Sequence, residues 1–304
     1  MAEIILHHFD SSPFAEKVRL ALGLKGLDWR SVEIPMVMPK PLLTALTGGY
    51  RKTPVMQIGA DIYCDTQCIA VELERRFPRP TLFPHHSEAL AIALSQWSDN
   101  AFFQPGAGLS MGTNAALPED ILRDRREFFN FLDFATLERQ LPHLYSQFRA
   151  HLQLVESMVS DGRQFVLGDV PGWLDILAYF PIWMCRGNIA KADDLLRGLS
   201  LLQAWEQRVR GIGHGRFRVL AAEEALAVAR ETQPVAVAEI CDDSWPDLSE
   251  NARVVVSPQD YGAVPVEGSL LRLTHSDIAI RRESALTGEV VVHFPRLGYR
   301  VETT

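Results

Sequence analysis

The sequence has 304 residues, more than one typical domain, so we expect two domains or one domain with additions. Its 47% of apolar and 22% of charged residues are ordinary for a globular protein that buries a sizeable core. The net charge of −8 and the lack of a long basic run argue against a nucleic-acid-binding protein.

The start of the chain and its cysteines narrow the class further. The opening MAEIILHHFD has no basic stretch and only a short apolar run, so it is unlike a signal peptide. The apolar stretch ILAYFPIWMC at 176–185 is too short to span a bilayer. Four cysteines are too few for a disulfide scaffold. We therefore expect a cytoplasmic protein with reduced thiols and no membrane association.

The first 78 residues alternate between strand and helix patterns, which is typical of a compact α/β unit. Three prolines after residue 34 predict an irregular loop. The expected elements, in chain order, are a strand at 4–9, a helix from the Ser-Ser-Pro junction to Gly26, a strand at 28–34, a hairpin turning at 59–61, and a helix at 65–77.

Residues 79–86 contain further prolines and predict a linker to an all-α domain at 87–230. Pro118 and the acidic pair after it begin a helix there, as the helix dipole favours. We expect Pro142 to interrupt this helix and Gly162 to end the next one, with further helices near 173–187 and 193–210.

Residues 231–304 have a different character. Short β-rich runs such as ARVVVS, DIAIRRE and EVVVHF alternate with glycines and prolines, which predicts a small antiparallel β module. We call residues 231–304 the C-terminal module. The predicted fold class is thus an α/β domain plus an all-α bundle domain, followed by this small antiparallel β module.

Four motifs together resemble the glutathione transferase superfamily. They are SSPFAEKVRLALGLKGLDW, KTPVMQ, YCDTQCIAVEL and FVLGDVPGWLDILAY. Their order and spacing cover about 220 residues, and the C-terminal module matches nothing expected of the family. The resemblance implies a thioredoxin-like glutathione-binding domain at 1–78 and a helical second domain. It departs at Gly172, where the family usually has Ser or Thr as a helix cap, although Asp175 still follows.

The resemblance implies that Ser12 stabilises the glutathione thiolate, with Ser11 as the alternative. A site that favours thiolate must supply positive potential or hydrogen-bond donors, and the N-terminus of a helix offers both. The alternative interpretation is that Ser12 only caps its helix. The thiol-transferring branches have Cys in place of Ser12, so a Cys-type transferase is disfavoured.

The resemblance also implies the remaining glutathione contacts, alongside simpler interpretations. Pro54 in a strand-like run suggests either a cis Thr53–Pro54 bond or an edge strand. Asp65 and Thr66 are expected to cap a helix and to hold the γ-glutamyl group. Lys40 is either the basic contact to the glycine carboxylate or a solvated surface lysine. The implied glutathione-binding residues are Phe14, Lys40, Thr53, Pro54, Asp65 and Thr66.

An acceptor pocket is expected to include Phe103, Met111 and Trp183, although aromatic side chains of this domain also suit core packing. The histidine pairs and the Cys64–Cys68 spacing do not suit a metal site. The resemblance therefore implies a detoxification-type transferase that joins glutathione to a small hydrophobic electrophile and forms a homodimer. The alternatives are a glutathione-dependent isomerase, reductase or dehalogenase, or a non-catalytic glutathione- or ligand-binding protein.

Overall fold

The computed structural model describes residues 3–114, 117–241, 245 and 248–304. The chain forms two compact units. We call the first, built from residues 1–15, 28–72 and 216–304, the sheet unit. We call the second, built from residues 16–27 and 73–215, the helical unit. Within the described residues, eleven strands form one sheet, and all of them belong to the sheet unit.

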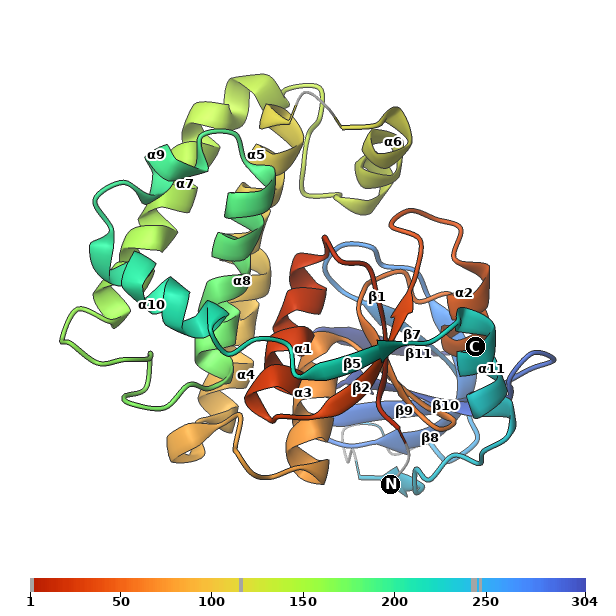
Figure 1. The fold of residues 1–304 in the computed structure, drawn as a ribbon. Helices are drawn as coiled ribbons and strands as arrows, with labels where there is room; N and C mark the ends of the chain where they lie inside the picture. The colour runs from red at the N-terminus through yellow and green to blue at the C-terminus, as the bar shows by residue number, and fades with distance from the viewer. Residues whose placement is uncertain (1–2, 115–116, 242–244, 246–247) are drawn as a thin grey trace. The chain divides into compact units, whose positions relative to one another are not determined.

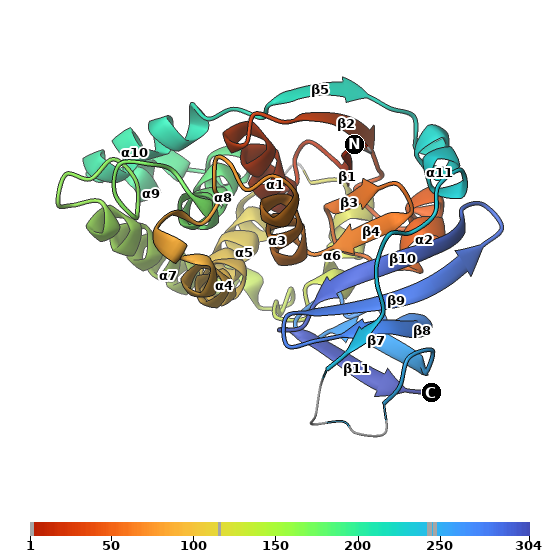
Figure 2. The same cartoon turned by 90° about the horizontal axis from the view of Figure 1, so that it is seen from below.

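The sheet joins the thioredoxin-like strands to those of the C-terminal module. Ten strands follow the order β11-β7-β8-β9-β10-β4-β3-β1-β2-β5, and β6 pairs with β8 (Figures 1 and 2). The strands are β1 (Ile5–His8), β2 (Asp28–Glu33), β3 (Val55–Ile58), β4 (Asp61–Cys64), β5 (Arg216–Val219), β6 (Glu239–Ile240), β7 (Arg253–Pro258), β8 (Val266–Leu273), β9 (Asp277–Ser284), β10 (Gly288–Pro295) and β11 (Tyr299–Thr303).

The thioredoxin-like part has the elements that the sequence predicts. Strands β1 and β2 pair in parallel, as a strand–helix–strand crossover through α1 (Pro13–Leu24) requires. Strands β3 and β4 form the expected antiparallel hairpin, with Gly59 at a φ of +63° in its turn. All four residues of β1 are buried: Ile5 and Leu6 are apolar, and the side chains of His7 and His8 are hydrogen-bonded.

Two segments of the sheet unit differ from the expectation. The proline-rich loop contains helix α2 (Pro41–Thr47), in which Pro41 is a first-turn residue that needs no N–H donor. Residues 216–230, expected inside the helical domain, form strand β5 and helix α11 (Ala222–Arg230) of the sheet unit. The predicted end of the helical domain at residue 230 therefore lies inside the sheet unit. Helices α2 and α11 lie side by side against the sheet (Figures 1 and 2).

Apart from the short β6, which pairs in parallel with β8, the C-terminal module is antiparallel, as predicted. It continues the thioredoxin-like sheet. Strand β10 pairs in parallel with β4, with Val292 opposite Ile62 (Figure 2). These two residues and Phe294 are fully buried in one hydrophobic cluster that also includes Ile5 of β1. The module therefore shares a core with the domain that precedes it, and it covers a strand edge that would otherwise be open to pairing.

The helical unit is built from seven α-helices of its own and parts of α1 and α3 within the described residues. The part of α3 (Thr66–Arg76) from Leu73 on belongs to it. Its further helices, which include the 3-10 helix η1 and the π-helix η2, are η1 (Pro84–His86), α4 (Glu88–Gln96), η2 (Trp97–Phe102), α5 (Phe103–Thr113), α6 (Glu119–Phe128), α7 (Leu137–Met158), α8 (Trp173–Asn188), α9 (Ala192–Leu196) and α10 (Ser200–Arg210). Among the described residues, every helix is too short or too polar to cross a bilayer.

The prediction that Pro142 interrupts a helix is wrong. Helix α7 runs through Pro142, which lies in its second turn, close to the start where a missing N–H is better tolerated. The break comes earlier, because the Asp133 carboxylate accepts hydrogen bonds from the Ala135 N–H and the Thr136 hydroxyl and so stabilises a turn.

Helix α8 begins with the capping arrangement that the sequence suggests. The Asp175 carboxylate accepts hydrogen bonds from the backbone of Gly172 at 3.0 Å and Val166 at 2.8 Å, and from the Trp205 indole at 2.8 Å. Burial raises the pKa of Asp175. A Cβ at position 172 would lie 2.7 Å from Pro84 Cδ, which explains glycine where the family usually has Ser or Thr.

Candidate functional site

The pairing of β1, β3 and β4 brings the predicted site residues of the sheet unit toward one end of these strands. In the ladders, Val55 pairs with His7 on one side and with Cys64 on the other. One residue earlier, Pro54 therefore lies between the ends of β1 and β4, which continue to Ser12 and Asp65. Because neighbouring strands are about 4.8 Å apart, the segments with Ser12, Thr53–Pro54 and Asp65–Thr66 all lie toward the same end of these three strands, and we call them the cluster.

Ser12 lies at the N-terminus of α1, with Pro13 as the first helical residue. Its side chain is buried, and its Oγ accepts a hydrogen bond from the Ala15 N–H at 3.1 Å. Ser12 therefore caps α1. The hydroxyl proton of Ser12 has no acceptor in the described part of the chain, so it can still be donated. Ser11 is exposed, and Phe14 is half-buried in the first turn of α1.

Lys40 is buried, at 5% exposure, so the interpretation as a solvated surface lysine is wrong. It precedes α2, and its Nζ donates to Thr53 Oγ1 at 3.0 Å. The same Nζ lies 5.6 Å from the ring centre of Phe9, whose carbonyl accepts a hydrogen bond from the Ser12 N–H. Lys40 therefore places a cation beside the Thr53 and Ser12 segments.

Of the two interpretations of Pro54, the structure has the first: the peptide bond between Thr53 and Pro54 is cis, and β3 is not an edge strand. On the other side of the cluster, Asp65 caps α3 by accepting the Gln67 N–H at 2.9 Å. Asp65 has a φ of +79°, a left-handed conformation that few side chains other than Asn and Asp tolerate. Such outliers are concentrated at ligand sites. Thr66 is buried, and its hydroxyl makes no hydrogen bond within the described residues.

The second carboxylate oxygen of Asp65 is bound by a residue of the C-terminal module. Tyr299 of the C-terminal module donates its hydroxyl to Asp65 Oδ2 at 3.0 Å. The Tyr299 oxygen also lies 2.9 Å from the Tyr50 hydroxyl. This contact joins residues 234 positions apart, so no local pattern could have indicated it.

The three predicted acceptor-pocket residues lie in the helical unit, in different surroundings. Phe103 is 3% exposed and packs with Phe129 and Phe180 at ring-centre distances of 6.0 and 6.2 Å, which is core packing. Met111 is half-buried on α5. Trp183, half-buried on α8, lies with its ring 5.7 Å from the Arg19 guanidinium.

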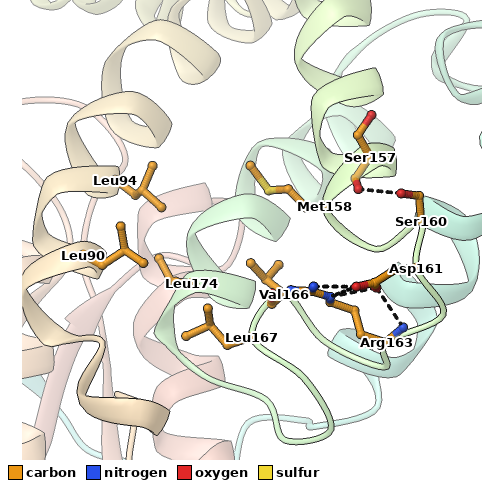
Figure 3. A pocket seen from close by; sticks show the side chains of 10 residues that line it. All are labelled: Leu90, Leu94, Ser157, Met158, Ser160, Asp161, Arg163, Val166, Leu167 and Leu174. Atoms are coloured by element: carbon orange, nitrogen blue, oxygen red, sulfur yellow. Dashed lines mark hydrogen bonds and ion pairs between the residues drawn. The ribbon is translucent and has the colours of Figure 1, made fainter.

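A cavity of about 320 Å³ lies elsewhere in the helical unit, between α4 and the end of α7 (Figure 3). Leu90, Leu94 and Leu174 give it an apolar wall. Its two charged lining residues, Asp161 and Arg163, are hydrogen-bonded to each other. The cavity therefore offers no uncompensated charge to a ligand, and none of the sequence-predicted site residues lines it.

His7, His8 and Cys64 are buried inside the sheet unit. His7 and His8 are buried and hydrogen-bond to Gln57 and Ser31, each at 2.9 Å. Burial raises the pKa of the Cys64 thiol, which makes it a poor thiolate. Within the described residues, the structure gathers no group of His, Cys, Asp and Glu side chains that could hold a metal ion.

Fold and site together define a protein with a thioredoxin-like sheet, a helical unit and a cluster of helix N-termini at one edge of the sheet. A family described as "Glutathione S-transferase, N-terminal domain" matches residues 6–81. A GST-like protein from Pseudomonas syringae is 35% identical, with full coverage of both chains and a TM-score of 0.81. The chain belongs to the glutathione S-transferase superfamily.

More distant relatives agree with this assignment. Glutathione S-transferase U4 of Arabidopsis thaliana is 25% identical over 198 residues, which are 64% of this chain and 77% of that protein. A theta class glutathione S-transferase from Xanthomonas axonopodis pv. citri, with glutathione bound, has a TM-score of 0.51 at 19% identity. That match covers 69% of this chain and 93% of the other, and it concerns the fold alone.

Proposed function

We propose that this protein is a glutathione-dependent transferase in which Ser12 stabilises the thiolate of bound glutathione for attack on a small electrophile. The single observation that carries the proposal is the hydrogen bonding of Ser12. Its oxygen is occupied by the Ala15 N–H, whereas its proton has no acceptor within the described residues. The hydroxyl is thus oriented by the helix and still able to donate to a sulfur anion.

The free energy needed to ionise the glutathione thiol at neutral pH is modest. A thiol with a pKa of about 8.5 is only a few per cent ionised at neutral pH, and each pKa unit corresponds to about 1.4 kcal/mol. A hydrogen bond to a charged group contributes about 1.5–3 kcal/mol, and the N-terminus of α1 adds a favourable dipole. Together these lower the thiol pKa enough to make thiolate a major species, after which proximity of the acceptor accelerates the transfer.

The rest of the cluster suits the other parts of glutathione. In this proposal Asp65 binds the α-amino group of the γ-glutamyl residue, and Thr66 binds its carboxylate at the N-terminus of α3. The backbone of Thr53, before the cis proline, binds the cysteinyl part. Lys40 is the cation for the glycine carboxylate, and Phe14 packs against the ligand.

The finer parts of the proposal concern the acceptor and the assembly. The electrophile is a small hydrophobic molecule, and Phe103, Met111 and Trp183 remain the proposed acceptor side. We also propose a homodimer in the cytoplasm, in line with what the family resemblance implies. Glutathione-dependent isomerisation, peroxide reduction and dehalogenation use the same activated thiolate, so a panel of electrophiles decides between them.

The test compares Ser12→Ala with Ser11→Ala, because the two hydroxyls are adjacent and only Ser12 is held by α1. We expect Ser12→Ala to lower turnover about tenfold or more with a model aryl halide, and Ser11→Ala to retain it. The reverse result would assign the role to Ser11, and two silent variants would refute thiolate stabilisation by either serine. Retention on glutathione resin without turnover of any electrophile would favour a non-catalytic binding protein.

A further inference from the structure

The last strand of the C-terminal module, β11, contacts the predicted glutathione-binding residue Asp65, although β11 is the outermost strand on that side of the sheet. Strand β11 is five strands away from β4 in the sheet order. In a flat sheet this would separate them by about 24 Å at a spacing of about 4.8 Å per strand. The hydrogen bond of 3.0 Å from Tyr299 to Asp65 therefore shows that the sheet of the module curls back to the end of β4.

The contact is a buried relay of two phenols. Tyr299 donates its proton to Asp65 Oδ2, so the bond between the two tyrosines must use the proton of Tyr50. Both side chains are 3–4% exposed, and both pack on Phe294 of β10 at ring-centre distances of 6.0 and 5.5 Å. Burial raises the pKa of both phenols, which keeps them protonated as donors.

The Tyr299 hydroxyl is the second hydrogen-bond donor that fixes the Asp65 carboxylate. The Gln67 N–H binds Oδ1 and the Tyr299 hydroxyl binds Oδ2, so rotation of the carboxylate is restrained at both oxygens. Each oxygen still has a lone pair for a further donor. A carboxylate that is oriented before the ligand arrives loses less entropy when a cation binds to it.

A second contact of the module lies near the other side of the cluster. Asp260 pairs with the ammonium group of Lys52, which also lies 4.6 Å from the ring centre of Tyr261. Lys52 directly precedes Thr53. The module therefore holds both the segment before the cis proline and the cap of α3.

We propose that Tyr299 is a positioning residue for glutathione, which holds the Asp65 carboxylate in the orientation that binds the α-amino group of the γ-glutamyl residue. This inference rests on the proposed function, and it gives the C-terminal module a role in ligand recognition. The module is then a part of the glutathione site, built from a region in which the sequence shows no family motif.

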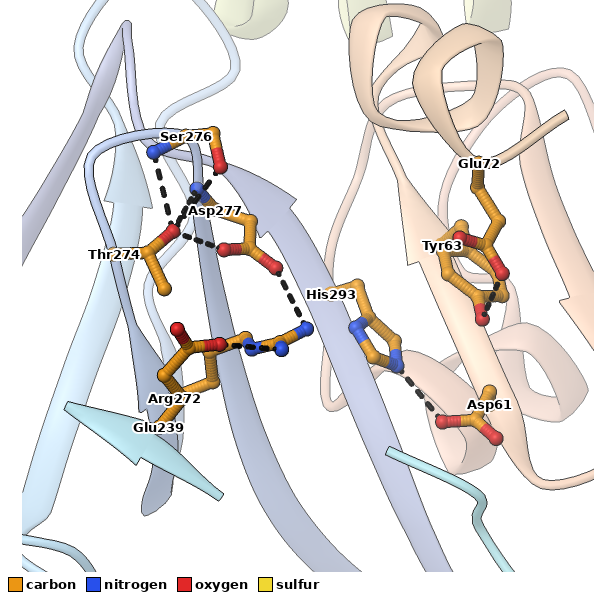
Figure 4. A network of polar contacts seen from close by, with 9 residues as sticks. All are labelled: Asp61, Tyr63, Glu72, Glu239, Arg272, Thr274, Ser276, Asp277 and His293. Carbon is orange, nitrogen blue, oxygen red and sulfur yellow. Dashed lines mark hydrogen bonds and ion pairs between the residues drawn. The ribbon is translucent and has the colours of Figure 1, made fainter. Parts of the chain in front are cut away.

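The test uses the full chain with Tyr299→Phe and a matched control, Tyr63→Phe. Tyr63 has the same 4% exposure and donates its hydroxyl to the Glu72 carboxylate at 2.9 Å (Figure 4). Two ligands are compared by calorimetry: glutathione, and glutaryl-cysteinyl-glycine, which is glutathione without the α-amino group. Only the first ligand presents a cation to Asp65.

We expect Tyr299→Phe to weaken glutathione binding by about fivefold or more, since a hydrogen bond to a charged group is lost. Its affinity for glutaryl-cysteinyl-glycine should equal that of the wild type, and Tyr63→Phe should bind both ligands as the wild type does. Unchanged glutathione binding by Tyr299→Phe, or an equal loss for both ligands, overturns the proposal, and so does the same selective loss in Tyr63→Phe.

Two further outcomes separate this inference from the proposed function. If Ser12→Ala keeps full turnover while Tyr299→Phe shows the selective loss, the thiolate mechanism fails and the role of Tyr299 stands. If the wild-type chain does not bind glutathione, both fail. Should Tyr299→Phe not fold, Tyr50→Phe replaces it, because it weakens the same relay. We then expect a smaller loss of affinity that is restricted to glutathione. A variant without this selective loss overturns the proposal.

Discussion

Acidification should destabilise this protein through His7, which is 2% exposed on β1. Its protonation state follows from its neighbour. Gln57 Nε2 donates to the carbonyl oxygens of Gly59 at 3.0 Å and Ala225 at 2.8 Å, so the Gln57 side-chain oxygen must accept. His7 Nε2, 2.9 Å from that oxygen, therefore carries the proton of a neutral imidazole.

Burial lowers the pKa of His7 from 6.5 to about 4. The unfolded chain binds this proton at a higher pH than the folded chain does. The stabilisation from a neutral His7 is therefore complete above pH 6.5 and is lost as the pH falls through the folded pKa. Since one pKa unit corresponds to about 1.4 kcal/mol, His7 should lower the free energy of unfolding by about 2 kcal/mol between pH 7 and pH 5.

The assay is urea denaturation of the wild type and His7→Gln at about pH 7 and pH 5. Glutamine can donate to the Gln57 oxygen but does not titrate, so the variant isolates the proton uptake from the loss of the side chain. The wild type should lose about 2 kcal/mol more than His7→Gln does over this interval. An equal loss in both proteins would show that His7 is not the group that couples folding to pH.

Two further predictions concern the helical unit. The Lys17 side chain is fully buried, and its Nζ lies 2.8 Å from both Asp99 carboxylate oxygens. Because Lys17→Met leaves the Asp99 carboxylate without this cation, it should lower the free energy of unfolding by about 3 kcal/mol. The double variant Lys17→Met/Asp99→Leu should recover part of this loss. A Lys17→Met protein as stable as the wild type in urea would contradict this. Asp175→Ala leaves three donors without an acceptor and should cost about 3 kcal/mol, with Asp175→Asn less harmful. Equal melting temperatures of the two Asp175 variants would show that these hydrogen bonds do not stabilise the helix start.

The parts of the site that the sequence predicted are those that depend on near neighbours. Ser12 and Asp65 occupy helix caps, and the capping pattern lies within three residues of each. The hairpin of β3 and β4 depends on a short turn. Its register places Pro54 next to the end of β4, where Asp65 follows. The family resemblance, and not the pattern of residues, indicated glutathione as the ligand.

The parts that the sequence did not predict depend on distant partners. The prolines around the start of α2 predict a loop, because a proline fits a helix start and a loop equally well. Strand β5 is short and exposed, and it pairs with β2, which is 188 residues earlier in the chain at the Asp28–Arg216 pair. The Tyr299–Asp65 contact requires the sheet of the C-terminal module to curl, which no local pattern of residues encodes.

The most direct test of the central claim is the pKa of the thiol of bound glutathione, measured from its thiolate absorbance as the pH is varied. In the wild type this pKa should lie at least about one unit below the reference of about 8.5, and in Ser12→Ala it should return toward that reference. A bound thiol whose pKa is the same in the wild type and in Ser12→Ala would contradict the role that we assign to Ser12.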